Sequence, residues 1–341
     1  MAEARVQRGG VSGATPSEVD HSDAASSSRD PADTVAATVT RRLEDVDSVP
    51  SVVTVGVFDG VHIGHQMLLG QVGDVARRAG LRAVAVTFDR NPIEVVRPGH
   101  QPPALQTLDD KIAALATTSV DLVHVLNFDV EASREPAQDF VARVLAGPIA
   151  AREVMIGANF RFGHRALGDL DLLEELGPHH GFTARAIDLV GVDGLEVSST
   201  AIRAALADGD VATAARGLGR PHRVGGPVVR GDGRGATIGV PTANVAVPDG
   251  LAVPSGGVYA TRTLVGDELH DSVTNVGIRP TFGGDHVTVE SHLLDADLDL
   301  YGRTVAVDFV QRLRDEQRFD GVDALVSQIH ADIAHARDVL G

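Results

Sequence analysis

The chain has 341 residues, with 30 basic and 47 acidic side chains, and its formal net charge is −17. This charge opposes non-specific binding to nucleic acid or to anionic lipid, so a phosphate ligand needs a locally positive pocket. The lack of cysteine excludes disulfides, thiolate nucleophiles and cysteine-ligated zinc. The apolar stretches are too short to cross a bilayer, and we expect a soluble, cytoplasmic protein of about two domains, with no obligate protein partner evident.

Residues 1–45 are predicted to form a disordered, acidic N-terminal tail. The segment is rich in Ser, Asp, Ala and Gly and has no sustained apolar periodicity. It also lacks the continuous apolar core of a secretory signal, so we expect no export. We expect this tail to be dispensable for activity.

Residues 46–216 alternate short apolar runs with helical patterns. Apolar runs occupy 52–57, 83–88, 122–126 and 153–156, and a helix is predicted over 66–79. Strands that alternate with helices are typical of a parallel sheet covered by helices. We therefore expect a Rossmann-like α/β domain.

The composition shifts near residues 216–222, where Gly219-Arg220-Pro221 introduces glycine turns and two-residue alternation. Alternating runs at 257–265, 287–293 and 304–310 predict antiparallel strands, which a small closed barrel leaves without exposed edges. Apolar residues from Val322 to Leu340 have helical spacing. Residues 217–341 are therefore predicted to form a β-barrel domain with a C-terminal helix.

The run from Thr54 to His65, TVGVFDGVHIGH, joins a strand, a glycine-rich turn and a helix start. Glycines let the backbone approach phosphates, and a helix N-terminus offers free N–H groups. His62 and His65 are placed to donate hydrogen bonds to charge developing on an attacked phosphate. Alternatively, a lone His-x-x-His consists of polar turn residues or a metal pair, although the chain has no HExxH pattern.

Val197-Ser198-Ser199-Thr200 precedes a second apolar helical run. Taken alone, its hydroxyls are read as a helix cap. Arg203 follows within the same run.

The stretch from Gly231 to Asn244, GDGRGATIGVPTAN, combines a flexible loop with hydroxyl and amide groups. It lacks the Gly-Lys-[Ser/Thr] of a Walker loop, and its glycines do not form a dinucleotide fingerprint. Taken alone, the stretch is read as a glycine hairpin.

These motifs resemble two known families. The GxFDGxHxGH form around His62 is similar to prokaryotic FAD synthetases of the nucleotidyltransferase superfamily, and FDRNP (88–92), GANFRFG (157–163) and VSSTAIR (197–203) strengthen that resemblance. Pro241-Thr242-Ala243-Asn244 resembles the PTAN motif of riboflavin kinases, together with GRP (219–221), GVYA (257–260), NVGIRPT (275–281) and LRDE (313–316). The combined resemblance spans about residues 50–340.

The first resemblance implies roles for residues of the α/β domain. His62, His65 and Arg203 are the expected catalytic groups. FMN is the expected acceptor for AMP from ATP. The residues expected to hold ATP and its phosphates are Gly56, Phe58, Asp59, Gly60, Gly64, Ser199 and Thr200, and those expected to bind the flavin are Asn91, Asn159, Phe160 and Arg161.

The second resemblance implies that the barrel transfers the γ-phosphoryl group of ATP to riboflavin. Glu290 matches the family's catalytic glutamate, and strand alternation places it opposite the Val287/Val289 face, where it can point into a pocket. Without the motif, it is read as a solvent-facing strand residue. Thr242 and Asn244 are expected to help bind Mg²⁺, while ATP is expected to contact Gly233, Gly235, Gly239 and Thr242.

The sequence departs from the resemblance at two positions: many relatives have FDPHP where this chain has Arg90-Asn91, and Asp where Asn159 stands. The leading hypothesis is an enzyme that converts riboflavin to FMN and FMN to FAD with ATP and Mg²⁺. Two alternatives remain open. One is a riboflavin kinase whose first domain uses another acceptor, and the other is a flavin-binding or sensing protein with decayed catalysis.

Overall fold

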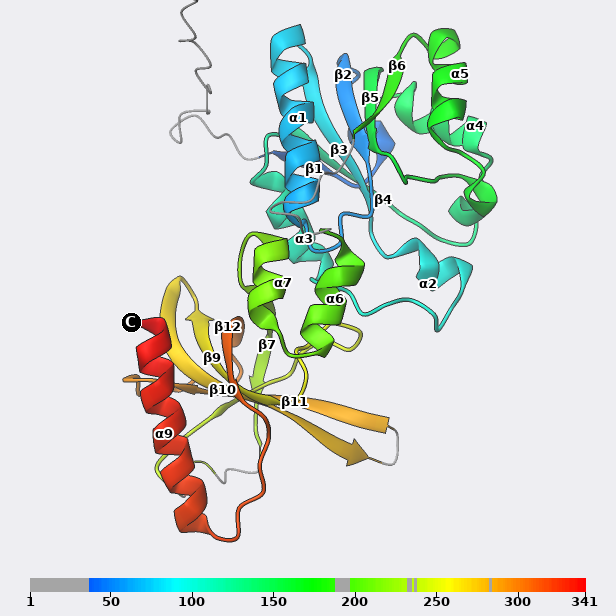
Figure 1. The fold of residues 1–341 in the computed structure, drawn as a ribbon. Helices are drawn as coiled ribbons and strands as arrows, with labels where there is room; N and C mark the ends of the chain where they lie inside the picture. The colour runs from blue at the N-terminus through cyan, green and yellow to red at the C-terminus, as the bar shows by residue number, and fades with distance from the viewer. Residues whose placement is uncertain (1–36, 188–196, 232–234, 236–237, 282–283) are drawn as a thin grey trace, which may run out of the picture. The chain divides into compact units, whose positions relative to one another are not determined.

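The computed structural model describes residues 37–187, 197–231, 235, 238–281 and 284–341 (Figure 1). Residues 1–36 of the expected tail lie outside these ranges. The prediction of disorder as far as residue 45 is wrong at its end, because Thr38–Thr40 form strand β1 and Leu43–Asp45 a short helix, η2. β1 pairs with β4, and Ala37 and Val46 are buried on either side of this segment. Three residues are too few to produce a recognisable apolar period.

The first half of the chain forms one sheet with six parallel strands, in the order β1-β4-β3-β2-β5-β6. This confirms the predicted parallel α/β architecture. Its remaining strands are β2 (Ser51–Val55), β3 (Arg82–Phe88), β4 (Leu122–Leu126), β5 (Ala151–Gly157) and β6 (Thr183–Ile187). The helical segments are α1 (Ile63–Ala79), α2 (Pro92–Val96), α3 (Leu108–Ala116), η3 (Ala132–Arg134), α4 (Ala137–Phe140), η4 (Val141–Leu145), η5 (His164–Ala166) and α5 (Leu170–His180).

Both faces of this sheet are covered. Consecutive residues of β2 point to opposite faces: Val52 packs in the cluster of α1 and α3, whereas Val53 packs in the cluster of α4, η4 and α5. Strand order reverses at β2, because the chain goes from β2 outward to β3 and β4, and then returns to β5 on the other side. Such a switch point leaves a crevice at the carboxyl ends of the strands, where α/β proteins bind ligands.

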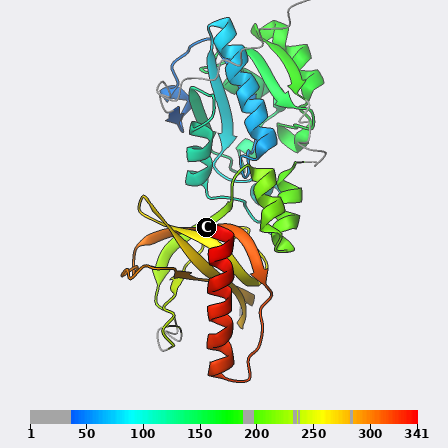
Figure 2. The same cartoon turned by 60° about the vertical axis from the view of Figure 1, so that its left-hand side comes forward.

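The second half forms the predicted closed antiparallel barrel, in the order β10-β11-β8-β7-β12-β9. Its strands are β7 (His222–Val229), β8 (Ala243–Val245), β9 (Gly257–Val265), β10 (Glu268–Thr281), β11 (Gly284–Leu293) and β12 (Thr304–Arg314). Helix α9 (Val322–Leu340) lies along the barrel and contacts β9, β10 and β12 (Figure 2). The helical spacing predicted for the C-terminal segment is therefore confirmed.

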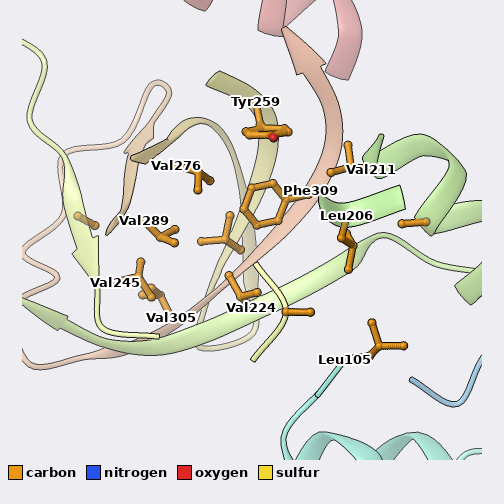
Figure 3. Packing of buried hydrophobic residues seen from close by; sticks show 14 of the residues in the cluster. Leu105, Leu206, Val211, Val224, Val245, Tyr259, Val276, Val289, Val305 and Phe309 are labelled. Carbon is orange, nitrogen blue, oxygen red and sulfur yellow. The ribbon is translucent and has the colours of Figure 1, made fainter. Parts of the chain in front are cut away.

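Two short helices, α6 (Ser199–Ala207) and α7 (Val211–Leu218), precede the barrel. Their apolar faces belong to the same buried cluster as the barrel interior, in which Leu206 and Val211 accompany Phe309 (Figure 3). Leu105, from the loop before α3, is also part of this cluster. The barrel core therefore extends to residues that precede residue 217 in the chain.

Candidate functional sites

The histidine motif begins where β2 ends, at the switch point of the sheet. His62 is the N-cap of α1, and its Nδ1 accepts a hydrogen bond from the His65 backbone N–H at 3.4 Å. The two imidazoles are stacked with ring centroids 3.5 Å apart and planes at 19°. The structure thus brings both predicted catalytic histidines to one helix N-terminus, whose free N–H groups and dipole favour an anion.

Both histidines are neutral at physiological pH. Burial lowers the pKa of His62 to about 4, and the positive charge of Arg203 acts in the same direction. Burial also lowers the pKa of His65 well below its usual value, with a contribution from His62. Since Nδ1 of His62 accepts a hydrogen bond, the ring proton lies on Nε2. The pair is therefore suited to donate hydrogen bonds from neutral rings rather than to supply positive charge.

Positive charge at this site comes from Arg203 of α6. Its Nη2 forms an ion pair with Asp59, and its Nε donates to the Pro103 carbonyl at 2.7 Å. The other Asp59 oxygen accepts from the Leu105 N–H at 2.9 Å. Asp59 thus holds the guanidinium of Arg203 close to the histidine turn.

The three hydroxyl residues at the start of α6, residues 198–200, have different roles. Ser198 is the cap, since its hydroxyl accepts from the Ala201 N–H at 3.1 Å. Ser199 instead donates to the Asp59 carbonyl at 2.9 Å, and Thr200 is exposed in the first turn. The alternative of a simple helix cap therefore applies to Ser198 and leaves Ser199 and Thr200 for other contacts.

Glycines allow the tight turn between β2 and α1. Gly60 has φ +84°, and a Cβ on Gly56 would lie 2.9 Å from the ring of Phe58. Phe58 itself has φ +50° and packs edge-on against His65, with centroids 5.2 Å apart. Gly64 is buried in the first turn of α1. The predicted phosphate-binding residues from 56 to 64 therefore form one continuous turn around the histidines.

The four residues expected to bind flavin come from two segments of the chain, one after β3 and one after β5. Asn91 caps α2 and lines a pocket of about 400 Å³ beside Asp59, on the β3 side of β2. Asn159, Phe160 and Arg161 follow β5, which pairs with the opposite edge of β2. Asn159 and Arg161 are exposed, whereas Phe160 stacks on Phe162 with centroids 5.8 Å apart. The two groups therefore follow the strands that pair with β2 on its two sides.

Sequence reasoning missed the role of Lys111, the single lysine of the chain. Its buried Nζ donates to the Phe88 carbonyl at 2.7 Å and to the Val57 carbonyl at 3.3 Å. It therefore joins the carboxyl ends of β2 and β3 and lines the pocket of Asn91. Burial lowers its pKa, and Asp59 and Asp89 oppose that shift. A lone lysine within an otherwise helical pattern was the available signal.

A second site lies on the outside of the barrel. A cavity of about 660 Å³ is bounded by the loop before β8, by outward-facing residues of β9, β10 and β11, and by α9. Val322, Leu325, Ile329 and Ile333 of α9 form an apolar wall, and Asn275, Glu290 and His292 form a polar one. An apolar wall facing a few polar groups suits a flat heteroaromatic ligand.

Glu290 points to this cavity, as its alternation predicts. Its neighbours Val289 and Ser291 are buried inside the barrel, so the side chain between them faces outward. Glu290 is paired in register with Asn244 of β8 on one side and with Asn275 of β10 on the other. The expected base and one expected metal ligand are therefore adjacent across two strands.

The PTAN segment, residues 241–244, is held against the polar wall of the cavity. His292 Nδ1 is 2.7 Å from the Pro241 carbonyl, and Thr242 lines the cavity with Gly235. A Cβ on Gly231 would lie 2.5 Å from the side-chain amide of Asn244, so a glycine leaves room for that amide. Gly239 has φ +80°, and Gly233 lies outside the described residues.

Two further polar residues of the cavity had no role assigned from the sequence. Arg314 at the end of β12 binds Asp332 of α9 with both Nε and Nη2, at 2.9 and 2.8 Å. Glu316 lines the same cavity. A bidentate pair of this kind fixes α9 relative to the barrel. The sequence signal was the LRDE segment, which contains Arg314 and Glu316 but not their partner.

The donor set of the second site suits Mg²⁺ bound together with a nucleotide. Thr242 and Asn244 supply neutral oxygens, which are hard ligands. In the described part of the chain, no group of three or more His, Asp or Glu side chains is placed to hold a metal ion alone. A metal at Thr242 and Asn244 would therefore need phosphate oxygens and water to complete its coordination, as is usual for Mg²⁺.

The fold and the two sites define a two-domain nucleotide-dependent transferase. The family model for FAD synthetase matches residues 45–201, and that for riboflavin kinase matches residues 218–340. Similar curated proteins carry the name bifunctional riboflavin kinase/FMN adenylyltransferase. The Escherichia coli K12 protein is 38% identical over 85% of this chain and 93% of its own length, and the Pseudomonas fluorescens protein 40% identical over 84% and 92%.

The chain belongs to the bifunctional riboflavin kinase/FMN adenylyltransferase family. A more distant relative from Bacillus subtilis, with the same name, is 33% identical over 84% of this chain and 91% of its own length. A Streptococcus pneumoniae crystal structure titled as a macrolide-efflux protein has a TM-score of 0.80 and 30% identity, and covers 89% of this chain and 99% of its own. That likeness supports the two-domain fold. No helix among the described residues is long and apolar enough to span a membrane.

Proposed function

We propose that the chain carries out both reactions of its family, and that each of the two sites performs one of them. The barrel phosphorylates riboflavin to FMN, and the α/β domain adenylylates FMN to FAD. The observation that carries this proposal is the pair of separate sites. One is the histidine turn with Arg203 and the pocket beside Asp59, and the other is the cavity beside Glu290. The ATP requirement of both reactions supports action in the cytoplasm.

In the barrel, Glu290 is proposed to accept the proton of the primary hydroxyl of riboflavin. The hydroxyl oxygen then bonds to the γ-phosphorus of ATP, and the bond from that phosphorus to the bridging oxygen breaks to release ADP. The ring system of riboflavin fits against the apolar wall of α9. Mg²⁺, when bound by the phosphates with Thr242 and Asn244, would neutralise charge on the transferred group.

In the α/β domain, a phosphate oxygen of FMN is proposed to attack the α-phosphorus of ATP, with pyrophosphate as the leaving group. The nucleophile is already ionised, so the site needs alignment and charge stabilisation rather than a strong base. Neutral His62 and His65 donate hydrogen bonds to the oxygens of the α-phosphate. Arg203 supplies the positive charge, while Ser199 and Thr200 at the start of α6 bind neighbouring phosphates.

The flavin contacts are proposed on the same basis. Asn91 lines the pocket beside Asp59 and is suited to contact the flavin of the acceptor. Asn159, Phe160 and Arg161, beyond β5, are suited to contact the part of the substrates that extends to the other side of β2. Gly233, Gly235 and Gly239 are proposed to approach the ATP phosphates in the barrel.

The direct test is a time course with the purified protein, riboflavin, ATP and Mg²⁺, followed by separation of the flavins. FMN should rise first and then be converted to FAD. FMN without FAD would contradict the adenylylation and reopen the acceptor of the first domain. Flavin binding without either product would favour the sensing protein and overturn both reactions.

A further inference from the structure

A loop of the barrel domain reaches the pocket of the adenylylation site. Residues 248–251, between β8 and β9, line the pocket of about 400 Å³ that also contains Asp59 and Asn91. The same residues are not part of the cavity beside Glu290. We propose that this loop is one wall of the FMN pocket, so that the kinase domain completes the acceptor site of the adenylyltransferase domain. This inference rests on the proposed function of the first site.

The loop is fixed in place by backbone hydrogen bonds to a strap that we define as residues 101–106. The Ala104 N–H donates to the Gly250 carbonyl at 2.8 Å, and the Ala252 N–H donates to the Ala104 carbonyl at 2.8 Å. Ala104 and Leu251 form a parallel bridge between the two segments. Two mutual bonds of this kind set the register of one segment on the other.

The strap in turn contacts the phosphate-binding residues of the first site. Leu105 donates to Asp59, and Pro103 accepts from Arg203. Leu105 is 3% exposed and packs in the buried cluster that fills the barrel (Figure 3). One short segment therefore connects the barrel core, the wall at 248–251 and the Asp59–Arg203 pair.

The charge of the pocket suits the flavin ring better than a polyphosphate. Its ionisable groups are four carboxylates and two cations. One of these cations, Lys111, already donates to two carbonyls, and the other, Arg90, is paired with Asp89. Phosphates are better accommodated at the histidine turn and Arg203, which leaves this acidic pocket for a flat uncharged ring system.

The lining has both of the surfaces that such a ring needs. Pro102, Leu108, Pro248 and Leu251 are apolar, whereas Asn91, Gln101, Gln106 and Asp249 offer polar groups. Leu251 and Asp249 come from the barrel domain and have no assigned role in the kinase reaction. A change at either position should therefore alter the use of FMN and leave the phosphorylation of riboflavin intact.

The test compares Leu251→Ala and Asp249→Ala in the full-length protein. Matched controls are Asp267→Ala, in the exposed turn between β9 and β10, and Leu269→Ala, at an exposed position near the start of β10. The loss of an apolar contact should raise the KM for FMN in FAD formation by roughly tenfold in Leu251→Ala. Asp249→Ala should raise it by about threefold. The KM for ATP and the kinase rate should stay within about twofold of the controls.

An unchanged KM for FMN in both variants would overturn the proposal. If Leu251→Ala also lowers the kinase rate, the substitution has loosened the barrel, and Asp249→Ala, at an exposed position outside the strands, decides the question. FMN binding measured by flavin fluorescence separates this inference from the proposed function. If the unmodified protein forms no FAD, but the variants bind FMN more weakly than it does, the proposed wall at 248–251 stands and the adenylylation is refuted.

Discussion

The two proposed sites are built on different parts of the backbone, although ATP is the proposed co-substrate of both. The first is built on the loop and helix start that follow a buried parallel strand, so it offers N–H groups, a helix dipole and neutral imidazoles. The second is built on the outward faces of antiparallel strands, so it offers side chains that strand register brings together, with Glu290 between Asn244 and Asn275. The first is therefore suited to stabilise anionic charge, and the second to accept a proton.

This difference also affects how each site depends on the rest of the molecule. The polar wall around Glu290 is fixed by neighbouring strands of one barrel. The histidine site instead depends on α6, whose Arg203 faces Asp59 while Leu206 packs with the barrel core. We therefore expect the kinase reaction to tolerate changes in the first domain better than the adenylylation tolerates changes in the second.

The largest expected effect is on the kinase reaction of Glu290→Gln. Removal of the proton acceptor should lower the rate of FMN formation by roughly 10² to 10⁴. FAD formation from supplied FMN should stay unchanged, since the cavity that Glu290 lines contains no residue of the histidine turn. Separate assays of the two half-reactions measure both effects.

Glu268→Gln is the matched control for this prediction, because its side chain is 82% exposed at the start of β10. It should not change either rate. An undiminished rate of FMN formation in Glu290→Gln would remove the base assignment and with it the chemical contrast between the sites.

The next largest effect is expected on the adenylylation, with the kinase reaction spared. His65→Ala should lower FAD formation by about 10² to 10³, the usual effect of losing one donor to a developing charge, and should spare riboflavin phosphorylation. His62→Asn should have a similar effect and keep a side-chain acceptor for the cap of α1, so the loss cannot be assigned to the helix. The rate of FAD formation from ATP and FMN is measured for both variants.

His179→Ala, at the exposed end of α5, is the control for these histidine variants. A loss of kinase activity in His65→Ala equal to its loss of adenylylation would show that the two sites are not separate.

Both folds could be predicted from the sequence because their apolar residues recur with different periods. Buried strands and amphipathic helices in residues 46–216, and alternating strands beyond 257, each leave a distinct apolar pattern. The sequence was also sufficient to place His62 next to His65, since both lie within one turn of the same helix. The end of the tail at β1 was missed, because Thr38–Thr40 are stabilised by pairing with β4 rather than by a pattern of their own.

Contacts between distant segments could not be predicted. Asp59 meets Arg203 across 144 positions, and Arg314 meets Asp332 only after α9 has packed on the barrel. The strap and the loop at 248–251 have no apolar period, and their pairing is a consequence of tertiary structure. The strand order, which places Asn91 after β3 and Asn159 after β5 on opposite sides of β2, is likewise a consequence of tertiary structure.

A smaller effect is expected from Gly231→Ala. The added Cβ would lie 2.5 Å from the amide of Asn244 and should displace this proposed metal ligand. The apparent KM for Mg²⁺ in the kinase reaction should rise by roughly tenfold, with adenylylation unchanged. Titration of Mg²⁺ in both half-reactions measures the shift.

Gly70→Ala is the matched control, because an added Cβ there meets nothing within 4 Å. If the apparent KM for Mg²⁺ rises in both half-reactions of Gly231→Ala, the loop before β8 does not belong to the second site alone.

The smallest effect concerns His222, which begins β7 and is 1% exposed. Its Nε2 lies 2.7 Å from the carbonyl of Ala252, the residue that also bonds to Ala104 of the strap. Burial lowers the pKa of His222 from 6.5 to about 4. The unfolded chain therefore binds this proton more tightly, so the stability from neutral His222 is full above about pH 6.5 and falls as the pH falls toward 4.

From pH 7 to pH 5, this one group should reduce the free energy of unfolding by about 2 kcal/mol. His222→Gln keeps an N–H donor for Ala252 and does not titrate, so its free energy of unfolding should fall less over the same interval. Urea unfolding at both pH values, with the exposed His335→Gln as control, measures the difference. An equal fall in His222→Gln and the unmodified protein would show that acid acts elsewhere, with His62 and His124 as the next candidates because burial lowers the pKa of each to about 4. A smaller fall would show that acid weakens the structure where the barrel supports the first site.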